Sequence, residues 1–288
     1  MRFFLDIELT NICNASCLIC PRSKLIRPKG KMARETFEEI ADKISLAKHF
    51  TEGIVAFCGF GEPLLHPDIF DFLKVLKKIP KKIEATLVTN GYRLSRRVTD
   101  KLIACGLDRI YISIQAADEG LYRTLMPGLK LNVVVNNVRY LVRCAPPDLR
   151  AIVTTTLHEL NREHKEKLAC LTASLGIRGF SVNNIHTRGG NLDDPRFIKK
   201  RVLNRAKRCR IFEEVNFISW DGRILPCCHD LEGITVADIT RNSFNDIAAI
   251  KRDVVKKGRK YAFCAYCNDE HRIRLFREYE NSKSYVDI

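Results

Sequence analysis

Short apolar runs and longer amphipathic stretches alternate along the first two thirds of this 288-residue chain. The runs are rich in β-branched and aromatic residues, which favours strands; they cover residues 3–9, 54–57, 83–88, 109–114, 151–157 and 179–182. In the longer stretches apolar residues recur every three or four positions, as on one face of a helix; examples are residues 36–47, 69–76, 98–105 and 164–175. The pattern predicts a regular succession of strands and helices.

Two glycines mark the ends of helices in this succession. Gly106 and Gly176 each follow a predicted helix directly, and glycine readily adopts the left-handed conformation that ends a helix. A strand, a helix and a further strand in this order build a parallel sheet with right-handed crossovers. We therefore expect an α/β fold with a parallel sheet over residues 1–190.

Three cysteines follow the first predicted strand. Cys13, Cys17 and Cys20 lie on a loop at its carboxyl end, where α/β barrels carry their chemistry. A four-iron cluster usually has one thiolate for each iron, so three cysteines leave one iron with an open position, as in reactive metal sites. The alternative is a zinc or structural site, but such sites usually show paired C-x2-C modules with a fourth ligand nearby.

The second predicted strand ends in a glycine-rich turn. Gly59 and Gly61 permit a close approach of the backbone, and Pro63 fixes the turn after Glu62. Polar residues also end the next two strands; they are Asn90, Ser113 and Gln115. These three residues either contact a ligand at the mouth of the barrel or cap the strand ends.

The cysteine loop and this turn resemble those of the radical S-adenosylmethionine (SAM) superfamily, although Ile19 stands where the family often has an aromatic residue. The resemblance implies a partial (β/α)6 TIM-type barrel in which the three cysteines hold a 4Fe-4S cluster and SAM binds the open iron. One electron then cleaves SAM to a 5′-deoxyadenosyl radical, which removes hydrogen from a substrate. The SAM-binding residues implied by the resemblance are Gly59, Gly61, Glu62, Pro63, Asn90, Ser113 and Gln115.

A second cysteine set lies in the last third of the chain: Cys209, Cys227, Cys228, Cys264 and Cys267. Asp221 and Gly222, between two apolar runs, predict a hairpin turn ahead of the adjacent pair. Four thiolates from three segments can close a small domain around a metal, and both zinc and iron–sulfur clusters accept such a set.

The order of these cysteines resembles the Twitch domain, the shortened SPASM domain that binds one auxiliary 4Fe-4S cluster, as in the aminocyclitol dehydrogenase and peptide-maturase branches. The implied ligands are Cys209, Cys227, Cys264 and Cys267. We choose Cys227 over Cys228 because neighbours on a strand point to opposite faces. The expected domains are a barrel at 1–195 and a small cysteine-rich α+β domain at 196–288. The remaining cysteines, 58, 105, 144 and 170, are expected to be small buried hydrophobic residues.

The net charge of +15 suggests an anionic partner, such as a phosphorylated substrate, an acidic peptide or a nucleic acid. The densest basic segment, residues 199–210, lacks the interleaved aromatic residues of a single-strand binding platform. No apolar run is long enough to span a membrane, and no signal peptide is apparent. Twelve cysteines without a secretion signal favour metal binding in a reducing cytoplasm.

These features predict an oxidoreductase that acts on a small polar or anionic substrate. The auxiliary cluster takes the substrate electron, and a low-potential donor such as flavodoxin or ferredoxin supplies the first electron. One alternative is a maturase that modifies a peptide or protein side chain; the chain starts at its first strand and has cysteines for one auxiliary cluster, which favours the small molecule. An alternative of another class is a metal-stabilised nucleic-acid-binding module.

Arg188 is the candidate residue for substrate contact and the only predicted catalytic position. It follows the sixth predicted strand, on the path between the two predicted domains. Its guanidinium group suits a carboxylate, phosphate or hydroxyl-rich ligand. The alternative is a linker arginine paired with Asp193 or Asp194.

Overall fold

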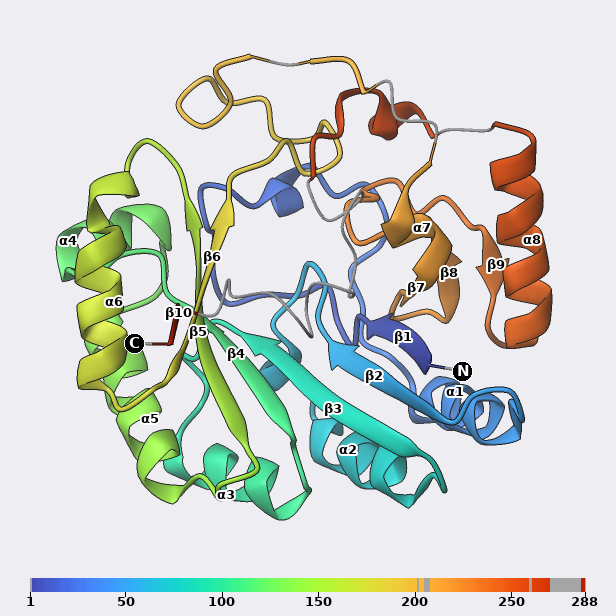
Figure 1. The fold of residues 1–288 in the computed structure, drawn as a ribbon, viewed down its shortest axis with the longest axis horizontal. Helices are drawn as coiled ribbons and strands as arrows, with labels where there is room; N and C mark the ends of the chain where they lie inside the picture. The colour runs from blue at the N-terminus through green and yellow to red at the C-terminus, as the bar shows by residue number, and fades with distance from the viewer. Residues whose placement is uncertain (1, 201, 205–207, 259–260, 270–285, 288) are drawn as a thin grey trace.

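The computed structural model describes residues 2–200, 202–204, 208–258, 261–269 and 286–287. Six parallel strands, each paired with the next along the chain, curve into a partial barrel (Figure 1). They are β1 (Arg2–Ile7), β2 (Glu52–Phe57), β3 (Lys82–Thr89), β4 (Arg109–Ser113), β5 (Arg150–Leu157) and β6 (Gly179–Asn184). The predicted parallel α/β fold is confirmed.

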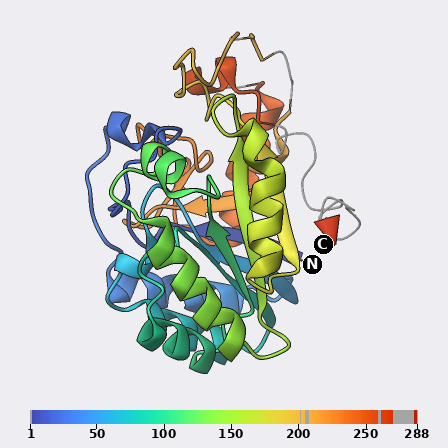
Figure 2. The same ribbon diagram turned by 90° about the vertical axis from the view of Figure 1, so that its left-hand side faces the viewer.

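Helices connect these strands, and α2, α3, α5 and α6 cover the outer face of the sheet (Figure 1; Figure 2). The α-helices are α1 (Arg34–Leu46), α2 (Ile69–Lys78), α3 (Arg96–Ala104), α4 (Glu119–Leu125), α5 (Leu131–Cys144), α6 (Lys165–Ser174), α7 (Arg210–Glu214) and α8 (Phe244–Lys256). Short 3-10 helices are η1 (Pro21–Lys24), η2 (Pro63–Leu65), η3 (Arg162–His164) and η4 (Ala262–Tyr266).

The packing follows from the apolar pattern. Strands β1 and β2 bury every second residue, and α1 buries Phe37, Ile40 and Ile44 on one face. Phe37 stacks on Phe72 of α2, with ring centroids 4.1 Å apart. Full burial of such an aromatic side chain contributes about 1.5–3 kcal/mol, so these contacts hold the helices against the sheet.

Helix α5 is not among the helical stretches given above as examples. Its sequence contains the run Val133-Val134-Val135, and β-branched residues have a low helix propensity because their χ1 angle is restricted. The helix nevertheless buries Val134, Val138 and Leu141 along one face. Burial against the sheet outweighs the local preference here.

The C-terminal part extends the same sheet through β7 (Val215–Ile218), β8 (Arg223–Leu225) and β9 (Ala237–Asp238). Strand β7 pairs parallel with β1, and β8 pairs antiparallel with β7. Gly222 donates its backbone N–H to the Ser219 carbonyl at 2.9 Å and has a φ of 84°, so the predicted hairpin is confirmed. At the opposite edge of the sheet, β10 (Val286–Asp287) pairs antiparallel with β6. The predicted boundary between residues 195 and 196 lies between β6 and α7 and stays a prediction.

A small apolar cluster fastens the segment after β6 to the cysteine loop. Ile19 packs with Leu192, Phe197 and Ile198 in a group separate from the main core. The apolar residue that replaces the family's usual aromatic one therefore still has a packing partner. Within the described ranges, no helix is long and apolar enough to cross a membrane.

Candidate functional site

The three N-terminal cysteines lie on the loop between β1 and α1, at the carboxyl end of the barrel strands. Backbone hydrogen bonds fix this loop against the end of α4. The Ser16 N–H donates to the Pro127 carbonyl at 3.1 Å, and the Leu18 N–H donates to the Leu125 carbonyl at 3.0 Å. The cysteine loop is therefore held in place by the segment at the end of α4.

Burial and the neighbouring thiols disfavour the thiolate forms in this loop. The pKa of the Cys17 thiol rises to about 12, mainly because the side chain is buried and secondly because Cys20 and Cys13 lie close to it. A bound metal reverses this preference, since a coordinating thiol is deprotonated. Three converging thiols with no carboxylate among them suit a soft metal site such as an iron–sulfur cluster.

The glycine-rich turn after β2 packs directly on the cysteine loop. A Cβ atom on Gly61 would lie 2.0 Å from the Thr10 carbonyl oxygen, so only glycine fits there. The Glu62 N–H donates to the Ile12 carbonyl at 2.9 Å. The glycine-rich turn and the cysteine loop are therefore in direct contact, so a shift of one would displace the other.

A buried ion pair, which sequence reasoning missed, packs against this turn. Arg27 donates to both carboxylate oxygens of Glu8, at 2.5 and 2.8 Å, and the two side chains are 1% and 0% exposed. The Phe60 N–H donates to the same carboxylate at 3.0 Å, and a Cβ on Gly59 would lie 2.7 Å from Glu8 Cγ. Because the partners are 19 positions apart in an irregular loop, no local pattern could have paired them.

Both oxygen atoms of the Glu62 carboxylate accept hydrogen bonds within the protein. It accepts the Asn90 backbone N–H at 2.8 Å, the Thr89 hydroxyl at 2.7 Å and the Leu64 N–H at 3.1 Å. Burial raises the pKa of Glu62, and the Asn90 N–H counters part of that rise. Glu62 therefore connects the ends of β2 and β3, while Pro63 begins η2.

The side chain of Asn90 faces the cysteine loop. Its Nδ2 donates to Asn14 Oδ1 at 2.9 Å and lies 4.0 Å from Cys13 Sγ. The Nδ2 atom of Asn14 is buried and has no hydrogen-bond partner among the residues that the structure describes. A polar group left unpaired beside the thiols is consistent with a site that accepts a polar ligand.

Ser113 and Gln115 lie at the carboxyl end of β4, and Gln115 joins β4 to β5. The Gln115 side-chain oxygen accepts the Thr156 N–H at 3.0 Å, and Asn161 Nδ2 donates to the Gln115 carbonyl at 3.0 Å. The oxygen atoms of Gln115 therefore act in strand-end capping, which was the alternative to ligand contact. Ser113 is the last residue of β4 and is half-buried.

His158, just after β5, is a further polar residue at this end of the barrel that sequence reasoning missed. It is 1% exposed, and neither ring nitrogen has a hydrogen-bond partner in the part of the chain that the structure describes. Its ring packs edge-on against Phe197, and burial lowers its pKa to about 4. A buried polar group of this kind is usually hydrogen-bonded to a water molecule or a ligand.

The structure brings the four candidate auxiliary ligands together from three segments. Cys209 precedes α7, Cys227 follows β8, and Cys264 and Cys267 lie within and just after η4. Burial raises the pKa of Cys227, and Cys228, Cys264 and Cys267 add to the rise. Burial likewise raises the pKa of Cys209, and Cys267 contributes. This second donor set also consists of sulfur alone.

Cys228 has different neighbours from Cys227. Its Sγ lies 3.8 Å from His229 Nδ1. Burial, then Asp6, then Cys228 raise the pKa of Cys58, at the end of β2. Cys227 thus has the other cysteines of its set as neighbours, whereas Cys228 is close to the barrel.

Two of the remaining cysteines differ from expectation. Cys105 is buried, as predicted, and Cys58 is half-buried, but Cys144 and Cys170 are exposed. Cys144 is the last residue of α5, and Cys170 lies on the solvent side of α6. Apolar neighbours in the sequence did not predict burial of these two cysteines, because residues a few positions apart on a helix can point to opposite sides.

Arg188 lies in the loop after β6 with a strained backbone. Its φ of 49° makes it the one residue other than glycine with a positive φ in the described ranges, and its Nε is buried without a partner. Asp193 pairs with Lys24 at 2.7 Å, and Asp194 pairs with Arg196 at 2.6 Å. Neither aspartate forms an ion pair with Arg188 among the residues described, so the linker alternative finds no support.

Comparison with known proteins identifies the family. The model of the radical SAM superfamily matches residues 7–170, which is more than half of the chain. The chain belongs to the radical SAM superfamily. The SPASM model, described as an iron-sulfur cluster-binding domain, matches residues 209–268. A radical SAM enzyme with a SPASM domain carries a SAM-binding 4Fe-4S cluster and auxiliary iron–sulfur ligation, so both cofactor predictions are confirmed.

Two curated relatives are similar over most of their length. The tungsten-containing aldehyde ferredoxin oxidoreductase cofactor-modifying protein of Pyrococcus furiosus is 24% identical over 78% of this chain and 70% of its own. The GTP 3′,8-cyclase of Alkaliphilus metalliredigens is 24% identical over 86% of this chain and 87% of its own. The names of these two relatives describe different activities, the modification of a cofactor and the cyclisation of GTP.

Solved structures share the fold. BtrN in complex with AdoMet and 2-DOIA has a TM-score of 0.61 with 18% identity, and 94% of each chain is covered. Streptococcus suis SuiB bound to precursor peptide SuiA has a TM-score of 0.70 with 16% identity, over 93% of this chain and 70% of SuiB. The partial barrel with a SPASM domain is thereby confirmed as the radical SAM fold of this chain.

Proposed function

We propose that this protein is a radical SAM oxidoreductase for a small polar or anionic substrate, working in a reducing cytoplasm. When bound, the first cluster would supply the one-electron chemistry that splits SAM for hydrogen abstraction from the substrate, and the auxiliary cluster would accept the remaining substrate electron. We assign the cluster ligands as Cys13, Cys17, Cys20, Cys209, Cys227, Cys264 and Cys267. The protein's own groups position the substrate and exclude water from it.

The observation that carries the proposal is the convergence of two sulfur-only sites on one continuous sheet. The SAM-cluster loop leaves β1, and β7, which leads into the hairpin before Cys227, pairs with β1. A fully ligated auxiliary cluster suits electron transfer, because it has no open position for substrate. The likeness to BtrN over nearly the whole of both chains, in a complex with AdoMet and 2-DOIA, supports a small-molecule substrate.

We assign the holding of SAM to Asn90 and to the turn Gly59–Pro63. Asn90 Nδ2 lies beside Cys13 Sγ, so this amide can reach a polar group bound at the cluster. The Glu62 carboxylate orients Asn90 through its backbone N–H. The backbone carbonyls of the turn are proposed to accept hydrogen bonds from the SAM ammonium group. Ser113 and Gln115, at the end of β4, are proposed to contribute further SAM contacts.

Arg188 is proposed to bind an anionic or hydroxyl-rich group of the substrate. Its strained backbone and unpaired Nε are consistent with a functional position, since strain of this kind costs about 1–3 kcal/mol and persists only where the surroundings impose it. The net charge of +15 also favours an anionic substrate and an acidic electron donor, for which we propose a flavodoxin or ferredoxin.

A peptide maturase is the second candidate function. The likeness to SuiB, solved with its precursor peptide SuiA, favours it. A nucleic-acid partner stays a prediction, and the alternative of a pure binding module is dropped because the chain belongs to an enzyme superfamily.

The test is anaerobic turnover with dithionite or reduced flavodoxin. The reconstituted protein is expected to form methionine and 5′-deoxyadenosine from SAM, and a variant with alanine at the four auxiliary cysteines should retain slow cleavage without product. Candidate polar metabolites and short peptides are then compared by the transfer of substrate deuterium into 5′-deoxyadenosine. Transfer from a peptide alone would favour the maturase, and no cleavage of SAM would overturn the proposed activity.

A further inference from the structure

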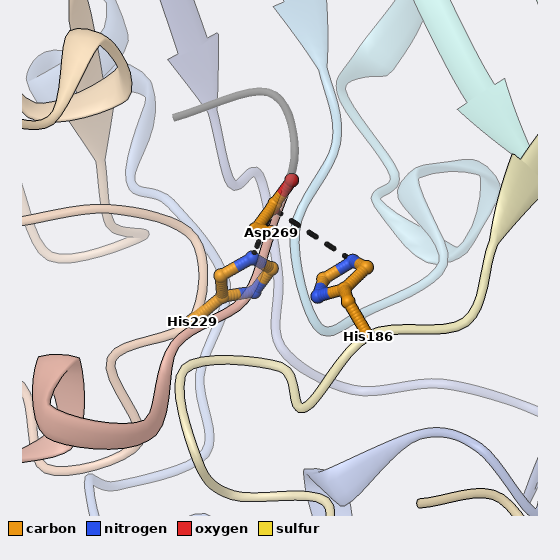
Figure 3. Close-up of side chains that lie close together, drawn as sticks. All are labelled: His186, His229 and Asp269. Atoms are coloured by element: carbon orange, nitrogen blue, oxygen red, sulfur yellow. Dashed lines mark hydrogen bonds and ion pairs between the residues drawn. The ribbon is translucent and has the colours of Figure 1, made fainter. Parts of the chain in front are cut away.

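His186, His229 and Asp269 form a compact cluster outside both cysteine sets. Figure 3 shows the two imidazole rings on either side of the Asp269 carboxylate. His186 lies in the loop after β6, His229 follows β8, and Asp269 follows η4. Three segments far apart in sequence therefore meet where the barrel adjoins the SPASM domain.

The distances within the cluster suit a bound cation. His229 Nε2 lies 2.8 Å from Asp269 Oδ2, and His186 Nε2 lies 3.7 Å from the same oxygen. One ligand atom from each residue can be chosen so that all three lie within 4.8 Å of one another. Metal–nitrogen and metal–oxygen bonds of about 2.0–2.2 Å place neighbouring ligand atoms roughly 3–3.5 Å apart, so small side-chain movements would complete the site.

We propose that His186, His229 and Asp269 bind one divalent transition-metal ion, at a site distinct from the two iron–sulfur clusters. Nitrogen and oxygen donors of this kind suit Zn²⁺ or Fe²⁺, whereas both cysteine sets are sulfur-only. Three protein ligands leave at least one coordination position for water or a substrate oxygen, as in catalytic metal sites. The site stands independently of the oxidation proposed above.

Burial and the surroundings of the rings support a metal. The three side chains are 12%, 6% and 6% exposed, and buried carboxylates are paired or coordinate metals. Cys228 Sγ lies 3.8 Å from His229 Nδ1, so that nitrogen can keep the ring proton while Nε2 faces the site. An orienting partner on the second nitrogen is typical of metal-binding histidines.

Two contacts oppose the metal in the free chain. His229 Nε2–H donates to Asp269 Oδ2 at 2.8 Å, and a metal at Nε2 displaces that proton. The Arg188 backbone N–H donates to His186 Nδ1 at 3.2 Å, which places the ring proton of neutral His186 on Nε2. Metal binding at Nε2 moves that proton to Nδ1 and breaks this bond. These two hydrogen bonds are together weaker than metal coordination, so coordination prevails, and metal binding should release the backbone turn at Arg188.

The test uses protein in which both clusters have been reconstituted anaerobically, so that the cysteines are occupied. After incubation with Zn²⁺ and desalting, we expect about one retained zinc per chain, with only nitrogen and oxygen scatterers at about 2.0–2.1 Å in zinc-edge X-ray absorption. His186→Gln and Asp269→Asn should each lose this zinc. The matched control is His164→Gln, because His164 also lies beside an aspartate, Asp118 at 3.2 Å, but belongs to no group of three candidate ligands in the described part of the chain.

Three outcomes would overturn the proposal: no retained zinc, zinc bound to sulfur at about 2.3 Å, or equal retention in the wild type and both variants. Each of these outcomes would show that the three residues only hold their segments together through hydrogen bonds and ion pairs. His186 is not adjacent to any candidate cysteine ligand, so His186→Gln decides the question even if Asp269→Asn disturbs the auxiliary cluster.

Discussion

Arg27 and Glu8 form a buried two-pronged ion pair that fastens the cysteine loop to the end of β1. The same carboxylate accepts the Phe60 N–H of the glycine-rich turn, and the Arg27 guanidinium lies 5.7 Å from the centre of the Phe60 ring. One charged pair therefore sets the relative position of the two loops assigned to the cluster and to SAM.

Replacing Arg27 tests this role. Arg27→Met leaves the Glu8 carboxylate buried without its cation, which costs about 3–5 kcal/mol of unfolding free energy. Anaerobic urea unfolding measures the loss. The control is Arg34→Met, whose exposed partners Asp68 and Asp71 should leave the unfolding midpoint close to that of the wild type. Equal midpoints for both variants would show that the buried pair does not stabilise the loops.

Close packing of the glycine-rich turn gives a second prediction. Gly61→Ala places a Cβ atom 2.0 Å from the Thr10 carbonyl, so the turn must move away from the cysteine loop. We expect the variant to lose SAM binding, measured by the change that SAM produces in the electron paramagnetic resonance spectrum of the reduced cluster. Gly120→Ala, where a Cβ atom would lie 3.4 Å from the Asp118 side chain at the start of α4, should bind SAM normally. Unchanged SAM binding in Gly61→Ala would remove the turn from the site.

The adjacent cysteines Cys227 and Cys228 should behave differently. Cys227 lies among the cysteines of the C-terminal set, whereas Cys228 is close to Cys58. Cys227→Ala should therefore lose the auxiliary cluster signal, and Cys228→Ala should keep most of it. Iron content and spectra of the two variants decide the assignment. The reverse pattern would make Cys228 the ligand.

Arg188 provides the test of substrate contact. Arg188→Ala should keep both clusters and SAM binding but reduce substrate affinity or turnover by about 1.5–3 kcal/mol, as for a lost hydrogen bond to a charged group. The ratio of product to 5′-deoxyadenosine measures the loss of coupling. Arg196→Ala is the matched control, because Arg196 already pairs with Asp194. A ratio unchanged from the wild type would exclude Arg188 from the substrate site.

Local patterns were sufficient to predict much of the fold. Strands β1 and β2 alternate in burial, and the glycines at 106 and 176 follow helices with φ values of 76°. Short-range motifs also identified the cysteine loop and the hairpin at Gly222. These features depend on neighbours within a few residues, which the sequence displays directly.

Contacts between distant segments could not be predicted in this way. The pairing of Glu8 with Arg27 and the meeting of His186, His229 and Asp269 depend on how loops cross in space. The sequence also failed to indicate that the Glu62 carboxylate would be occupied by backbone N–H groups, and it left strand-end capping as one of two roles for Gln115. Such groups are satisfied by partners that only the folded chain brings near.

The central claim is that the chain holds two four-iron clusters on two separate cysteine sets. The most direct measurement is the iron and sulfide content of the anaerobically reconstituted protein, together with its Mössbauer spectrum. We expect close to two four-iron clusters in the wild type. One cluster should remain after replacement of Cys13, Cys17 and Cys20, with no SAM cleavage, and one should remain after replacement of Cys209, Cys227, Cys264 and Cys267. A preparation with one cluster and one zinc bound to sulfur would contradict the account.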